Sequence, residues 1–197
     1  EINSIPIEES QEPDWETVDL NSFSQGECRT IGGEAIAWDA FNRLDFPQML
    51  SDLGFNDNQI HQVALLVIGR LLHPASERET AFWGKDISAL GELMDTNFQH
   101  LSNNALYRTS DALLRNRDEI ERRLAERGRE WLGLGEKVIL YDLTNTYLTG
   151  SAHESSLAMR SRSKEKRNDC PLVTLALAVD EDGFPKGSRV LPGKVSE

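Results

Sequence analysis

The chain has little of several things that mark well-known protein classes. Its 197 residues include only two cysteines, Cys28 and Cys170, which are too few and too far apart for a disulfide framework or a thiolate metal site. The longest clear apolar stretch, Val63 to Ile68, is far shorter than the ~20 residues that a helix needs to cross a bilayer. The chain does not open with a charged segment followed by an apolar one, as a secretory signal would. We therefore expect a cytoplasmic protein without a membrane-spanning segment.

Positive charge is also scarce. Lys and Arg number 21 against 33 Asp and Glu, which gives a net charge of -12, and the first fifty residues hold 11 acids but only 2 bases. Tight non-specific binding to nucleic acid needs clustered cations, so any such binding must be local. The one candidate is a run of five cations within eight residues, and a bare run of this kind is more often a solvated loop. Its members are Arg160, Arg162, Lys164, Lys166 and Arg167.

The residue pattern divides the chain into three zones. Residues 1–31 are acidic and interrupted by proline and glycine, and we expect an extended or partly disordered lead-in. Residues 32–133 carry helical periodicity, and residues 134–197 change to short strand-like runs. The sequence therefore predicts an α+β protein with a helical N-terminal domain.

Two helical patterns are the clearest. Apolar residues repeat at helical spacing from Ile60 to Leu72, where Asp57 or Asn58 can cap the start and Pro74 ends the helix. The segment 76–79 has the form of a capping box that opens the next helix. A later stripe is expected on a helix that also carries the ion pairs Asp118–Arg122 and Glu119–Arg123. The stripe is expected to face the core and consists of Leu106, Leu113, Ile120, Leu124 and Trp131, and the arginines around it are interpreted as a solvated helix face.

Three strands are predicted in the last third of the chain. The run 137–141 is continuously apolar and rich in β-branched and aromatic residues, which is typical of a strand buried on both faces. A second strand is expected at 172–179 and a third at 186–191. The segment 180–183 ends in Asp-Gly, which supplies the positive φ of a tight hairpin turn.

Asp142 follows the first of these strands directly. A carboxylate at the end of a central strand lies at the rim of a sheet, where it can meet solvent, a metal ion or a substrate. The alternative is that Asp142 and the Thr144-Asn145-Thr146 segment only cap a turn through hydrogen bonds from side chain to backbone. The four histidines are isolated from one another and none is spaced as a metal pair, so we expect structural or solvated roles for them.

Several blocks of this sequence resemble bacterial insertion-sequence transposases of the DDE type. The resemblance begins with Tyr141-Asp142-Leu143-Thr144-Asn145-Thr146-Tyr147 and continues through residues 164–171 and the Asp-Gly-Phe-Pro block at 182–185. Segments 74–80 and 106–111 are similar to the helical N-terminal region of that family. The resemblance covers most of the chain from about residue 27 onward. The Asp142 block and the Asp-Gly-Phe-Pro block are specific when they occur together in this order.

The resemblance implies a ribonuclease H-like catalytic domain whose first three antiparallel strands are present and which is otherwise truncated. It assigns the first catalytic, Mg²⁺-binding carboxylate to Asp142 and to no other residue, because the second Asp and the Glu of the family lie on later elements. Glu197 does not correspond to that Glu. Two-metal phosphoryl transfer needs carboxylates on each ion, so one Asp is not enough. We therefore expect this chain to be inactive by itself, and departures at Leu148-Thr149 and Lys194 indicate a divergent or decayed copy.

The same resemblance changes the interpretation of the basic run. In the implied fold the run from Arg160 to Arg167 connects strands one and two near the active site, where its cations could bind phosphates of transposon-end DNA. Expected partners are that DNA and either a second copy of the chain or a full-length transposase. One alternative is a truncated, non-catalytic interaction module that binds or inhibits a full-length transposase. A weaker one is an unrelated α+β domain, which a structure with strands 137–142 and 172–179 apart would favour.

Overall fold

The computed structural model describes residues 16, 17, 19, 21, 28–133, 138–150, 152–160 and 169–193. Most of the predicted lead-in lies outside these residues. Within them, each helix is either too short or too polar to span a membrane.

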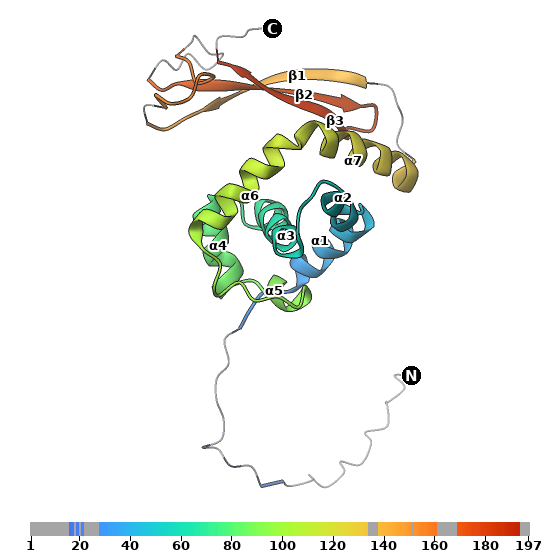
Figure 1. The fold of residues 1–197 in the computed structure, drawn as a ribbon, viewed down its shortest axis with the longest axis vertical. Coiled ribbons are helices and arrows are strands. Elements are labelled where there is room, and N and C mark those ends of the chain that lie inside the picture. The colour runs from blue at the N-terminus through green and yellow to red at the C-terminus, as the bar shows by residue number, and fades with distance from the viewer. Residues whose placement is uncertain are drawn as a thin grey trace, which may run out of the picture.

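The described residues form a bundle of seven helices followed by a three-stranded sheet (Figure 1). Helix α3 runs through the bundle and contacts α1, α2, α4 and α6, whereas the sheet lies beyond α7 on one side. This arrangement confirms the predicted α+β class with antiparallel strands. The elements are α1 (Gly32–Arg43), α2 (Phe46–Asp52), α3 (Asp57–Leu72), α4 (Glu77–Asp86), α5 (Leu90–Leu93), α6 (Asn103–Arg115), α7 (Arg117–Leu132), β1 (Val138–Tyr147), β2 (Leu172–Asp180) and β3 (Pro185–Pro192).

Helix α3 forms where the periodicity predicts it, but its cap is Asn56 rather than Asp57 or Asn58. The Asn56 side chain accepts from the Gln59 backbone N–H at 3.0 Å, and the Gln59 side chain accepts from the Asn56 N–H at 3.0 Å. This reciprocal pair satisfies two amides that the first turn leaves free. At the other end the helix stops at Leu72, two residues before Pro74, as expected.

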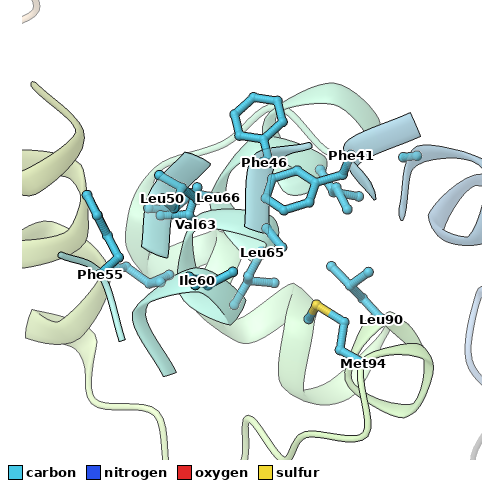
Figure 2. Close-up of a cluster of buried hydrophobic side chains, with 14 of the residues drawn as sticks. Phe41, Phe46, Leu50, Phe55, Ile60, Val63, Leu65, Leu66, Leu90 and Met94 are labelled. Atoms are coloured by element: carbon cyan, nitrogen blue, oxygen red, sulfur yellow. The ribbon is translucent and has the colours of Figure 1, made fainter. Parts of the chain in front are cut away.

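The hydrophobic core lies around α3 and is drawn in Figure 2. Leu50, Val63 and Leu65 are fully buried, and the rings of Phe41 and Phe46 stack with centroids 4.4 Å apart. Helix α4 approaches α3 closely because Gly84 has no side chain. A Cβ at Gly84 would lie 2.6 Å from a methyl carbon of Leu65. The helix contact therefore depends on glycine at this position.

The predicted stripe from Leu106 to Trp131 spans two helices, because the chain breaks at Asn116 between α6 and α7. Leu106 and Ile120 are buried as expected. Trp131 is 40% exposed, so the prediction of a core position for it is wrong. Its ring lies under the guanidinium of Arg43, whose Cζ is 5.9 Å from the ring centroid. That contact lies at the surface of α1 and α7.

The three strands form an antiparallel sheet in the order β1-β2-β3. The predicted strands at 137–142 and 172–179 are neighbours, which removes the observation that would favour an unrelated α+β domain. The first strand is longer than predicted, however. Because β1 runs to Tyr147, Asp142 lies in the middle of the strand and not at its end, and the Thr144-Asn145-Thr146 segment pairs with β2 instead of forming a turn.

Candidate functional site

Asp142 occupies an exposed position on β1 opposite Leu177 of β2. Its Oδ1 accepts a hydrogen bond from the backbone N–H of Leu143 at 2.9 Å. Among the described contacts, this bond engages one oxygen of the carboxylate. Because Asp142 is exposed, solvent or a ligand can approach its carboxylate.

The face on which Asp142 lies follows from the register of the sheet. Ala176 and Ala178 of β2 line a hollow together with α7, so their side chains face that helix. Leu177 lies between them and points to the opposite face, because side chains alternate along a strand. Asp142 is the register partner of Leu177 and shares its face. The carboxylate is therefore on the side of the sheet that α7 does not cover.

That face combines one acid with apolar and hydroxyl side chains. Thr144 and Thr146 follow Asp142 at every second position of β1, so they lie on the same face, and both are exposed. Leu175 shares the face of Leu177, and its register partner Val190 on β3 is 45% exposed. The carboxylate of Asp142 therefore lies beside a partly exposed apolar surface.

The described part of the chain does not supply a metal centre around Asp142. No group of three or more His, Cys, Asp or Glu side chains in this part is arranged to hold a metal ion. The nearest acid along the ladder is Asp180, which pairs with Val138, four residues from Asp142 on β1. At the rise of a strand this is about 13 Å, whereas two catalytic ions lie about 4 Å apart and share a carboxylate. A two-ion site therefore does not fit the described residues.

Asp180 has a structural role. The sequence showed only that this residue belongs to a turn. The residue is 3% exposed, and its Oδ1 accepts from the backbone N–H groups of Asp182 at 3.1 Å and Phe184 at 2.8 Å. Its Oδ2 lies 2.9 Å from Nζ of Lys186. Burial acts to raise the pKa of Asp180, but the bonds from Lys186 and the two backbone groups outweigh it and lower the pKa below its usual value. Asp180 is therefore an ionised anchor of the β2–β3 turn.

Of the predicted DNA-binding cations, only Arg160 is described. It is exposed and follows Met159, whose backbone exchanges two hydrogen bonds of 3.0 Å with Leu172 at the start of β2. Leu172 is five residues from Leu177, the partner of Asp142, which corresponds to about 17 Å along the sheet. Arg162, Lys164, Lys166 and Arg167 lie outside the described residues.

The arginines of α7 are occupied by contacts within the protein. Arg123 contacts both Glu119 and Asp52 at 2.8 Å, and Nε of Arg127 donates to the backbone oxygen of Arg43 at 3.1 Å. Hydrogen bonds from Arg122 and Arg123 lower the pKa of Glu119 to about 2. The predicted pair Glu119–Arg123 is confirmed, whereas Asp118 pairs with Arg117 instead of Arg122. These partly exposed ion pairs fit the interpretation of the arginines as a solvated helix face rather than a DNA patch.

A hollow beside the sheet lies on the face opposite Asp142. It has a volume of about 510 Å³ between α7 and strands β2 and β3, and Ala125, Ala176 and Ala178 are among its lining residues. Glu121 of α7 closes one side, because its Oε1 accepts from the Ser188 hydroxyl at 2.5 Å. This hollow is therefore separate from the candidate carboxylate.

Comparison with known proteins identified no relative of this chain. No family model, no curated protein and no solved structure matches this chain. Its function is therefore inferred from the residues and their arrangement.

Proposed function

We propose that this chain is the N-terminal part of a DDE-type DNA transposase, with a ribonuclease H-like sheet beginning at β1. Supporting this are the helical region that precedes the sheet and three antiparallel strands in the order β1-β2-β3. The observation that carries the proposal is the exposed carboxylate of Asp142 on the first strand, on the face that α7 leaves open. In this proposal Asp142 is the first of the carboxylates that bind Mg²⁺.

By itself, this chain should not complete the reaction. An exposed carboxylate such as that of Asp142 suits Mg²⁺ as one ligand among several, since Mg²⁺ keeps most of its waters. DNA cutting and joining that is assisted by two metal ions needs further carboxylates close to Asp142. The described residues do not supply them. Transposon-end DNA is then a substrate of the complete catalytic domain, and this chain contributes one ligand to it.

A nicking assay tests the metal chemistry. The chain is incubated with labelled transposon-end DNA in Mg²⁺ or Mn²⁺, and no metal-dependent nicking above background is expected. A longer polypeptide that carries the remaining carboxylates should nick the same DNA. Asp142→Asn in that polypeptide should lower the nicking rate by at least about 100-fold, whereas Asp182→Asn, at an exposed carboxylate in the β2–β3 turn, should leave it near the parent rate. Nicking by the short chain that Asp142→Asn abolishes would contradict the predicted inactivity.

A second candidate is a non-catalytic module that binds a full-length transposase. The observation in its favour is the apolar part of the open face, where Leu175 and Leu177 are half-buried and Val190 is exposed. Such a module should form a complex with an active transposase and lower its transposition rate whether or not Asp142 is replaced by Asn. An effect that depends on Asp142 would favour the catalytic interpretation instead.

A further inference from the structure

A second cavity lies in the helical region, between the first turns of α3 and the loop that leads into α6. Its volume is 340 Å³, within the range of small-molecule sites. The polar lining residues are Asn58, His61, Gln62, Thr96, Asn97, His100 and Ser102. None of the ten lining residues is Asp, Glu, Lys or Arg, although 27% of the chain is charged.

Within the described part of the chain, several polar groups of the lining residues have no protein partner. Nδ1 of His61 is buried without a hydrogen bond. Oε1 of Gln62 accepts from the Thr109 hydroxyl at 2.7 Å, and no described contact uses the Nε2 group of Gln62. Oδ1 of Asn97 accepts from the Gln99 backbone N–H at 2.7 Å, which likewise leaves its amide N–H groups free among the described contacts. Gln62 is half-buried and Asn97 is exposed, so their N–H groups can donate to a ligand or to water.

The rest of the cavity wall is apolar. Phe98 is 6% exposed, and Leu101 and Ala105 are half-buried beside it. The ligand should therefore have an apolar face as well as a hydrogen-bonding edge. His100 is exposed at the same cavity, where its imidazole can stack on a flat ring.

The composition of the lining excludes most charged ligands. A phosphate or carboxylate would normally meet Arg or Lys, which are absent from this lining. A divalent cation would need carboxylates, thiolates or a third imidazole, and the described residues do not assemble such a set. Amide side chains, by contrast, offer a donor and an acceptor side by side and match the edge of a purine or pyrimidine.

We infer that this cavity binds a neutral, planar, hydrogen-bonding heterocycle of the nucleobase class. The amides of Asn58, Gln62 and Asn97 would read the edge of the ring, and Phe98 and Leu101 would contact its apolar part. Two sources share this chemistry, namely a free nucleoside and an unpaired base in DNA. Asp142 has no part in this binding, so the cavity can be tested separately from the proposed transposase function.

The test uses the chain as given with two kinds of probe. Free adenosine and cytidine are titrated while the imidazole signals of His61 and His100 are followed by NMR. A DNA duplex with one bulged 2-aminopurine is titrated by fluorescence against the fully paired duplex. A saturable shift with a nucleoside identifies a free nucleoside as the source, and binding of the bulged duplex alone identifies an unpaired base.

Two variants link the binding to the cavity. Ala105→Phe fills the space, and the double variant Asn58→Ala/His100→Ala removes an amide and an imidazole whose exposed positions make a folding defect unexpected. Each should weaken binding at least tenfold. Matched controls are Asn104→Ala and His153→Ala, which lie at exposed positions outside the cavity and should bind as the parent does.

The inference is overturned if neither probe binds. It is also overturned if glucose, a neutral but non-planar ligand, shifts the His61 signal as strongly as the nucleosides do. Equal binding by the parent and by both cavity variants would place the ligand elsewhere and would also overturn it.

Discussion

Two aspartates of the same sheet show how strongly local surroundings set the role of a carboxylate. Asp142 is exposed and accepts a backbone hydrogen bond from Leu143, whereas Asp180 is buried and is held by Lys186 and two backbone N–H groups. Asp142 belongs to one of the blocks that resemble a DDE transposase, and Asp180 lies two residues before another. The exposed carboxylate of Asp142 is accessible to a ligand, whereas that of Asp180 is buried, so the structure separates a candidate site residue from a structural one.

The turn anchored by Asp180 should respond to acid. Its lowered pKa in the folded protein means that the carboxylate adds stability above the unfolded pKa of about 3.9, and that this stability is lost as the pH falls through the folded pKa. Asp180→Asn should lower the melting temperature by several degrees at pH 7 and flatten its fall from about pH 5 downward. Thermal scans between pH 2.5 and pH 7 measure both effects. Asp182→Asn, at an exposed carboxylate of the same turn, is the control, and equal acid sensitivity of parent and Asp180→Asn would rule out this anchor.

Sequence reasoning found Asp142 as a candidate but placed it wrongly at a strand end. The Thr144-Asn145-Thr146 segment favours turns, and only its pairing with residues 173–175 of β2 keeps it in the strand. The role of Asp180 was not visible either, because Lys186 is brought to it by the hairpin and by the register shift between Ala178 and Val179. Such contacts depend on tertiary pairing, which periodicity does not encode.

At the scale of elements, the helix caps give a direct comparison. Asn56 caps α3 through two hydrogen bonds, whereas Ser102 stands at the N-terminus of α6 without a side-chain cap. Asn56→Ala should therefore lower the free energy of unfolding by about 1 kcal/mol. Ser102→Ala should change it by less than about 0.5 kcal/mol. Urea unfolding followed by circular dichroism measures both, and equal losses would show that the Asn56 contacts carry no stability.

The contact between α3 and α4 predicts a steric effect. Gly84→Ala should destabilise the protein by about 1–3 kcal/mol, because the new methyl group meets Leu65 in the core. Gly32→Ala is the matched control, since a Cβ there has no atom within 4 Å. The same urea experiment compares them. A stability of Gly84→Ala equal to the parent would mean that Leu65 moves aside without cost.

The sequence predicted helix α3 and its end well, because a long apolar period and a proline both mark it. It could not show the break at Asn116, since the apolar spacing of Leu113 and Ile120 continues across it. The Asn116 side chain donates to the backbone oxygen of Ala112 at 2.9 Å and so ends α6 locally. Asparagine favours such local bonds over a continuing helix, but the spacing alone did not reveal this.

At the scale of the whole molecule, the negative net charge opposes DNA binding. Any DNA binding should therefore depend on the basic run from Arg160 to Arg167. A variant with Ala at Arg160, Arg162, Lys164, Lys166 and Arg167 should bind duplex DNA more weakly. Its salt dependence of log K should be shallower by about 0.9 for each phosphate that is no longer neutralised. Arg108→Ala, at an exposed arginine elsewhere, is the control. Fluorescence anisotropy at several salt concentrations gives the slopes, and an unchanged slope would exclude this run from the DNA interface.

Helix α7 has a consequence for how the molecule can be divided. Its Arg123 and Arg127 hold α2 and α1, while its Glu121 holds the Ser188 edge of the sheet. A force applied to the sheet would thus reach the helices through side chains as well as through the covalent chain. A fragment that begins at residue 134 would contain the sheet but lack α7, the helix that contacts β3. A fragment that starts at Arg117 keeps that support and is the better choice for isolating the sheet.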